Sequence, residues 1–146
     1  MLDRTELCQL IPHAGRMCLL DEVLSWDRES VVCLSHSHRR EDNPLRDNGR
    51  LAGVHAVEYG AQAMAVHGGL MARETGEPIR PGFLVSLRNV ELQVDRLDLI
   101  ESPLSVSARQ LMADGGNLLY QFEILAQGSP IAKGKLAVMV QPEGSN

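Results

Sequence analysis

The stretch RLAGVHAVEYGAQAMAVHGG, residues 50–69, predicts the central element of the fold. From Gly53 onward it contains no proline, and small or apolar residues fill most positions, so one helix is expected that ends by Arg73. About 17 residues with a rise of about 1.5 Å each form a rod of roughly 25 Å. Such a helix is long enough to cross a small domain.

The polar residues of this helix fall together. At about 100° per residue, His55, Glu58, Tyr59 and Gln62 share one face, and small or apolar residues occupy the opposite face. A carboxylate and a carboxamide one turn apart on an otherwise apolar helix indicate a functional group that faces a cleft. The alternative is a surface helix with a solvated polar face, and the residues alone leave both interpretations open.

The composition is that of one globular domain. The chain has 146 residues, of which 44% are apolar and 23% charged. Its net charge of −5 argues against a nucleic-acid partner, and no apolar run approaches the length of a membrane span. The N-terminus lacks a signal-peptide pattern. We therefore expect a cytoplasmic protein with a single domain over residues 1–140 and a disordered tail over residues 141–146.

Cysteine and histidine spacing gives no indication of a bound metal. Cys8, Cys18 and Cys33 are odd in number and have no paired spacing, which is typical of buried thiols in a reducing compartment. No CxxC occurs, and the close pair His36 and His38 lies in a strand-like segment. We expect neither a metal site nor a cofactor.

The remainder of the chain predicts a short helix and a set of strands. Residues 3–10 begin like a capped helix, with Thr5 or Asp3 as the cap. Charged and proline-containing segments predict loops at 39–50 and 75–82, and Gly115-Gly116 suits a hairpin turn. Partly alternating, β-branched segments predict strands at 18–26, 30–38, 83–94, 104–112, 118–127 and 131–140.

This order of elements predicts an α+β fold. An antiparallel sheet has one face to bury, and here one substantial helix can cover it. We therefore expect a curved antiparallel sheet wrapped around one long central helix. Exposed sheet edges predict pairing with a second copy, as a homodimer or a higher oligomer.

Three segments resemble the hotdog-fold β-hydroxyacyl-acyl carrier protein dehydratases of fatty-acid synthesis. LIPHAGRMCLLDEVLSWD (10–27) resembles the family's N-terminal LPHRxPFLLVDRV stretch, and AGVHAVEYGAQAMA (52–65) resembles its PGVLxxEAxAQ helix. PGFLVSLRNVEL (81–92) is similar to the strand that follows that helix. DNPLR (42–46) and the helix together also resemble the subgroup associated with aryl-polyene-type lipid pathways. The resemblance covers nearly the whole chain and implies a hotdog fold.

The resemblance implies removal of water from a 3-hydroxyacyl thioester carried by an acyl carrier protein or CoA. This reaction needs a base for the α-proton, an acid for the hydroxyl and donors to the thioester oxygen. Glu58 matches the family's helix carboxylate, and Gln62 matches its glutamine. Gly53 and Val54 would offer backbone N–H groups to the thioester oxygen, with help from the helix dipole. Glu58 as an ordinary hydrogen-bonding residue of a dimer interface is the alternative.

One departure from the family motif concerns the base. The family carries a histidine nine residues before the glycine that matches Gly53, and Pro44 stands at that distance here. Asp47 and Asn48 lie nearest its place in the shortened loop, so Asn48 is a candidate for substrate binding.

Two histidines are candidate substitutes for the missing base. His55 shares a face with Glu58 one turn away and is the preferred one, although a histidine at a helix start also makes local hydrogen bonds. His38 is the second candidate. His67 lies about 180° from Glu58 around the helix, so it is expected to be structural.

Three functions follow from these observations. The first is a dehydratase in which Glu58 is the acid and His55 the base. The second is a non-catalytic subunit that completes a heterodimer with an active dehydratase. The third is a thioesterase, which the N-terminal segment 10–27 disfavours. Met64 and Met71 suit an acyl channel and ordinary core packing equally well.

Overall fold

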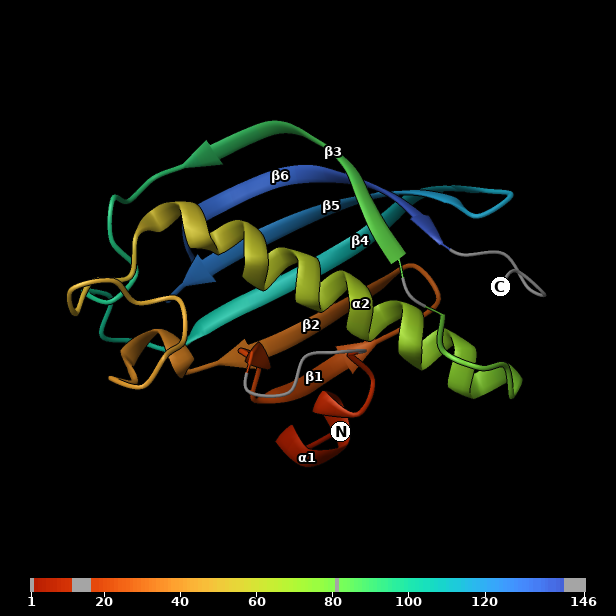
Figure 1. Ribbon diagram of the computed structural model, residues 1–146, viewed down its shortest axis with the longest axis horizontal. Coiled ribbons are helices and arrows are strands. Elements are labelled where there is room, and N and C mark those ends of the chain that lie inside the picture. Colours follow the sequence, from red (N-terminus) through yellow and green to blue (C-terminus); the bar gives the residue numbers. More distant parts are fainter. Residues whose placement is uncertain (1, 12–16, 81, 141–146) are drawn as a thin grey trace.

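A six-stranded antiparallel sheet curves around one long helix (Figure 1). The computed structural model describes residues 2–11, 17–80 and 82–140. The predicted α+β architecture is confirmed. Across the sheet the strands are ordered β1 (Glu22–Trp26), β2 (Ser30–Ser35), β4 (Leu104–Asp114), β5 (Asn117–Ala126), β6 (Ser129–Val140) and β3 (Gly82–Leu92).

The central helix begins with a 3-10 turn, η3 (Gly53–His55), and continues as α2 (Ala56–Thr75). It ends slightly beyond the predicted Arg73, because Gly76 adopts a left-handed conformation with φ 74° that ends the helix. The Gly76 N–H bonds to carbonyls of the last turn. Figure 1 shows α2 lying along the inner face of the curved sheet.

Short turns join the later strands. Gly115 and Gly116 both have positive φ and link β4 to β5, as predicted. Gln127 and Gly128 do the same between β5 and β6. The first predicted strand was too long at its start. Residues 18–21 run outside any strand, because the backbone of Leu19 bonds to side chains instead of a neighbouring strand.

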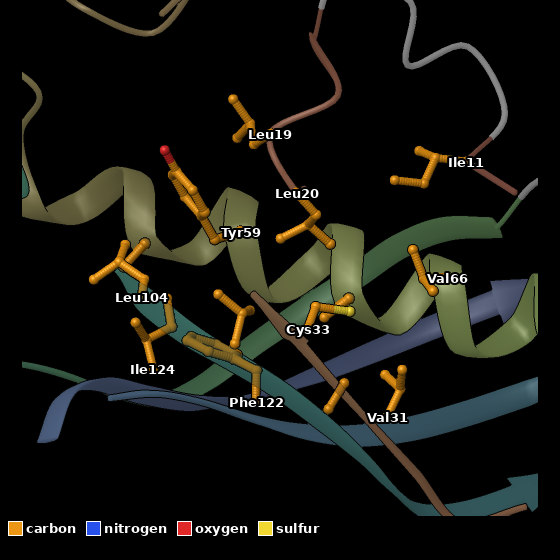
Figure 2. Close-up of a cluster of buried hydrophobic side chains, with 14 of the residues drawn as sticks. Ile11, Leu19, Leu20, Val31, Cys33, Tyr59, Val66, Leu104, Phe122 and Ile124 are labelled. Atoms are coloured by element: carbon orange, nitrogen blue, oxygen red, sulfur yellow. The ribbon is translucent and has the colours of Figure 1, made fainter. Parts of the chain in front are cut away.

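The core fills the space between α2 and the sheet. Figure 2 shows the Tyr59 side chain extending towards the side of the helix on which Leu19 lies, whereas Phe122 and Ile124 lie on the other side of the helix. A Cβ atom on Gly60 would lie 2.4 Å from Cγ of Phe122. This glycine therefore lets the helix backbone approach the aromatic ring directly.

The edge strand β3 differs from the other strands of the sheet. Within the described part of the chain it pairs with β6 alone. Ten of its eleven residues are exposed, so large apolar side chains meet solvent on both of its faces. Most of these side chains would be expected inside a protein; they are Phe83, Leu84, Val85, Leu87, Val90 and Leu92.

The N-terminal segment corrects the expectation for the cysteines. Asp3 caps α1 (Arg4–Cys8) by accepting a hydrogen bond from the Glu6 N–H at 3.0 Å. Cys8 and Cys18 form a disulfide, so the prediction of three thiols is wrong for these two. They pair because α1 lies beside the extended residues 18–20. Cys33 is a buried thiol as expected, and burial raises its pKa to about 12.

Among the described residues, no helix is long and apolar enough to cross a bilayer. The predicted tail, residues 141–146, lies outside the described residues.

Candidate active site

The start of the central helix is held by an extended segment that follows β3. Gly53 donates its N–H to the Asp95 carbonyl at 2.7 Å, and the Leu97 N–H donates to the Leu51 carbonyl at 2.7 Å. A Cβ atom on Gly53 would lie 2.1 Å from the Val94 carbonyl oxygen. Glycine is thus required here for close packing of two backbones. Its N–H already has a partner inside the protein, contrary to the expectation that it faces the thioester.

A buried carboxylate reinforces this junction. Asp98 accepts hydrogen bonds from the Leu51 N–H at 2.9 Å and from two guanidinium nitrogens of Arg96. The Arg96 hydrogen bonds hold the pKa of Asp98 below its ordinary value. Asp98 therefore remains charged at neutral pH and fixes the chain just before the helix.

Val54 and His55 follow Gly53 in the 3-10 turn. Val54 is 58% exposed, and the first N–H groups of a helix lack partners within it. The Val54 N–H is therefore the remaining candidate donor to a thioester oxygen. His55 is half-buried, and its side chain makes no hydrogen bond to any described residue.

Glu58 lies one turn after His55 and contacts Gln62. The Gln62 Nε2 donates to Glu58 Oε1 at 3.3 Å and to the Met17 carbonyl at 2.6 Å. The Gln62 Oε1 accepts from the Leu19 N–H at 2.8 Å. Gln62 thus joins the N-terminal segment to α2 and orients Glu58. The nitrogen and the oxygen of its carboxamide both have hydrogen-bond partners within the protein, so Gln62 is a positioning residue.

Tyr59 belongs to a buried chain of hydrogen bonds whose direction is determined. The Ser35 hydroxyl donates to the Leu19 carbonyl at 2.6 Å and so accepts from Ser37 at 3.1 Å. The Ser37 oxygen then accepts from the Tyr59 hydroxyl at 2.8 Å, and Tyr59 accepts from Asn43 Nδ2 at 3.1 Å. This network attaches the loop that precedes α2 to the helix. The polar face of α2 is consequently buried at Tyr59 and Gln62, which excludes the interpretation as a solvated face.

His38 has a structural role in the fold. Its Nε2 lies 3.0 Å from each of the carbonyl oxygens of Ile100 and Ser102, and the side chain is completely buried. Desolvation lowers its pKa. His38 is therefore a poor substitute for the missing base.

Asn48 is the second residue of a tight turn. The Asp47 N–H and carbonyl exchange hydrogen bonds with Arg50 at 2.9 and 3.0 Å, while Asn48 and Gly49 both have positive φ. This is the conformation that an Asn-Gly pair favours. Asn48 is exposed and its conformation serves the turn.

His67 lies just beyond the middle of α2 and has the structural role that its position on the face opposite Glu58 predicted. It is completely buried, with Nδ1 2.6 Å from the Tyr120 hydroxyl and Nε2 2.9 Å from the Asp27 carbonyl. Beside this pair a cavity of about 520 Å³ opens between the second half of α2 and the sheet. No cluster of three metal-ligating side chains occurs within residues 2–11, 17–80 and 82–140.

A curved antiparallel sheet wrapped around one long central helix defines a hotdog-fold protein. The chain belongs to the ApeP-like family (ApeP dehydratase), which matches residues 5–146. This match confirms the dehydratase resemblance and the aryl-polyene-type subgroup. No curated protein matches the chain.

Solved structures support the same fold. A chain of the dehydratase heterocomplex ApeI:P from Xenorhabdus doucetiae is 26% identical, with a TM-score of 0.85 over 94% of this chain and 91% of that one. A hypothetical thioesterase with coenzyme A from Streptococcus pneumoniae TIGR4 is 13% identical, with a TM-score of 0.61 over 85% and 88%. A mutant of thioesterase PA1618 from Pseudomonas aeruginosa is 16% identical, with a TM-score of 0.62 over 96% and 94%. The thioesterases are similar in fold alone.

Proposed function

We propose that this chain is a subunit of a 3-hydroxyacyl-thioester dehydratase and supplies the acid of the reaction from Glu58. The observation that carries the proposal is the Glu58–Gln62 pair on the first turns of α2. Gln62 is fixed by two backbone groups of residues 17–19, so it holds the carboxyl group in one orientation. A fixed acid near the exposed start of a helix is the arrangement that acid catalysis on a bound thioester requires.

The reaction divides among groups at this helix start. A base takes the proton from C2, the C3–O bond breaks, and the hydroxyl leaves as water with the proton of Glu58. The electrons of the C2–H bond form the new double bond. The Val54 N–H and the positive end of the helix dipole would stabilise the charge on the thioester oxygen. His55 is the candidate base, because its half-buried imidazole has no partner among the described residues.

The partner of the chain is part of the proposal. The exposed apolar edge of β3 offers unpaired backbone groups to a strand of a second subunit. Similarity to a chain of the ApeI:P heterocomplex supports a second dehydratase as that subunit. A homodimer through the same edge is the alternative. We also propose that the substrate is carried by an acyl carrier protein or CoA, and that the protein acts in the cytoplasm.

Hydration of a trans-2-enoyl thioester, followed as loss of enoyl absorbance, tests the catalytic assignment. The chain is assayed alone and after coexpression with a histidine-bearing hotdog dehydratase. We expect Glu58→Gln to lower the rate about 100-fold or more, with Tm changed by a few degrees at most. The matched control is Glu74→Gln, on the same helix, which removes only an exposed carboxylate 3.8 Å from Arg28.

Two results would change the assignment. If Glu58→Gln had the wild-type rate in the presence of the second subunit, this chain would be a non-catalytic subunit. Release of free thiol from an acyl-CoA would favour the thioesterase function.

His55→Ala should lower the rate if His55 is the base, and unchanged kinetics would remove it from the mechanism.

A further inference from the structure

Cys18 lies between the two backbone groups that hold Gln62. The Met17 carbonyl accepts a hydrogen bond from Gln62 Nε2 at 2.6 Å, and the Leu19 N–H donates to Gln62 Oε1 at 2.8 Å. The same Gln62 nitrogen donates to Glu58. A change in the path of the chain at Cys18 therefore moves the partners of the Gln62 carboxamide and, through them, alters the orientation of the Glu58 carboxyl group.

The segment around Cys18 is held from two sides. On one side Arg4 of α1 donates to the Cys18 carbonyl at 2.9 Å, and on the other side Ser35 of β2 donates to the Leu19 carbonyl at 2.6 Å. Residues 18–21 lie outside any strand. Because no strand pairing fixes this segment, the covalent bond between Cys18 and Cys8 restricts it where a backbone ladder does not.

The short helix α1 is itself fastened to the rest of the domain. The Leu7 side chain is completely buried, and the Leu2 carbonyl accepts from the Val23 N–H of β1 at 3.0 Å. Cys8 is the last residue of this helix. The disulfide thus joins Cys18 to an element that has a fixed position against the sheet.

The two cysteines differ in exposure, which determines how the disulfide can be reduced. Cys8 is half-buried, whereas Cys18 is buried, so a thiolate from solvent attacks the Cys8 sulfur. After reduction the Cys18 thiol has an acceptor in place, because its Sγ lies 3.8 Å from the Leu20 carbonyl oxygen. Disulfides of cytoplasmic proteins are usually reversible, and the cytoplasm is the compartment proposed above.

We propose that the Cys8–Cys18 disulfide positions Glu58 through Gln62, and that reduction of this disulfide lowers the rate of the dehydratase reaction. This regulation rests on the proposed function, since it acts on the same carboxyl group. The reductant is a dithiol. One of its thiolates attacks Cys8 Sγ, and the Cys18 sulfur leaves and takes up a proton. The second thiolate then displaces Cys8, which is also protonated. The dithiol becomes a disulfide, and its two electrons and two protons pass to the cysteines.

Hydration of a trans-2-enoyl thioester by the oxidised and the reduced protein, with the second subunit present, tests the effect on the rate. Dithiothreitol reduces the chain and is removed by gel filtration before the assay, because free thiols add to enoyl thioesters. Thiol titration of the denatured chain verifies each state, with Cys33 alone reacting in the oxidised protein and all three cysteines in the reduced protein. We expect kcat to fall about threefold to tenfold on reduction with KM little changed, and oxidised glutathione to restore it.

Three variants separate positioning from a structural role. Cys8→Ser should have the kcat of the reduced wild type and should not respond to dithiothreitol. Cys33→Ala is the matched control, because it removes the cysteine outside the disulfide and should keep the response. Gln62→Met should lose the response of kcat, since the side chain through which the disulfide acts is absent. A disulfide that only stabilised the fold would change Tm and leave kcat unchanged.

Hydrogen exchange of the Leu19 amide, followed by NMR, tests the structural step without turnover. Reduction should speed exchange of this amide about tenfold, because its acceptor Gln62 is no longer held in one position. The amide of Ile124 in β5 is the reference. The same change is expected in Glu58→Gln, so a failure of the catalytic assignment is separable from a failure of the positioning role.

Four outcomes would overturn the proposal. Three reactive thiols in the air-oxidised chain would show that the disulfide does not form. Equal kcat in the two verified states would limit the disulfide to a structural role. Unchanged exchange at Leu19 would show that Gln62 is held without it. A response to dithiothreitol that persists in Cys8→Ser or Gln62→Met would place the effect elsewhere. If neither state catalysed hydration, the proposed function and the effect on its rate would both be wrong, and the exchange at Leu19 alone would decide the positioning role.

Discussion

The two halves of α2 pack in different ways. In the first half the buried polar groups of Tyr59 and Gln62 are saturated, by a directed network at Tyr59 and by backbone groups of residues 17–19 at Gln62. In the second half, small residues such as Gly68 border a cavity, and the buried His67 is set behind it. The half that holds the candidate acid is fixed in place, whereas the half beyond it leaves room for a ligand.

Glycines on the helix show this difference most directly. A Cβ atom on Gly60 would meet Cγ of Phe122 at 2.4 Å, while one on Gly68 would meet no atom within 4 Å. The same residue type thus permits close packing at one position and leaves space open at the other.

The largest expected effect compares these two glycines as alanine variants. Gly60→Ala should lower the free energy of unfolding by about 2–3 kcal/mol, because the methyl group overlaps a buried ring. Gly68→Ala should raise it by about 0.5–1 kcal/mol, since alanine is the better helix former. Urea unfolding followed by circular dichroism measures both. Equal effects of the two variants would show that the halves do not differ in packing.

A smaller effect is expected when the first half loses its link to residues 17–19. Gln62→Met leaves the buried Leu19 N–H without an acceptor, which should lower the free energy of unfolding by about 2 kcal/mol. It also releases Glu58, so kcat of the hydration reaction should fall more than KM rises. Gln121→Met, at an exposed position, is the control for the substitution itself. A fall in stability with unchanged kcat would limit Gln62 to a structural role.

For the first half of α2, the features that depend on local sequence patterns could be predicted. Helical periodicity placed Glu58 and Gln62 together, and the glycine pair at 115–116 gave the hairpin. The Asn48-Gly49 pair is a recognisable turn signal in the sequence. Comparison of its spacing with the family's histidine motif led instead to a prediction of substrate binding for Asn48. The occupied N–H of Gly53 could not be predicted, because its partner Asp95 is more than forty residues away in the sequence.

Long-range contacts account for the other differences. The Cys8–Cys18 disulfide depends on the packing of α1 beside residues 18–20, which spacing in the sequence does not reveal. The polar network at Tyr59 also joins residues of β2, the following loop and the helix, and only their types were visible in advance. Gln110 and Tyr120 become neighbours through strand register, so the polar side of the cavity was not foreseen.

The smallest expected effect is a pH dependence that arises at the far half of α2. Desolvation lowers the pKa of His67 below the ordinary value of 6.5. Below that pH the unfolded chain binds a proton that the folded chain does not, so stability falls as pH decreases from about 6.5 and is level above it. For one titrating group, the free energy of unfolding can fall by at most about 1.4 kcal/mol per pH unit. The hydrogen bond from His67 to the Asp27 carbonyl opposes the effect of desolvation on the pKa, so the expected loss at His67 is about 0.5–1 kcal/mol at pH 5.5.

The variant His67→Gln isolates this contribution. A glutamine can donate to the Asp27 carbonyl and accept from the Tyr120 hydroxyl, so both hydrogen bonds can form without a titrating group. Urea unfolding at pH 7.5 and 5.5 should show a smaller loss in the variant than in the wild type. His38→Gln should behave in the same way, because desolvation also lowers the pKa of His38. The lowered pKa of Asp98 acts in a lower pH range, below its ordinary 3.8, and does not contribute between these two pH values. If the loss were the same in wild type and His67→Gln, His67 would be protonated in the folded protein, and the assignment of Tyr120 as its donor would be wrong.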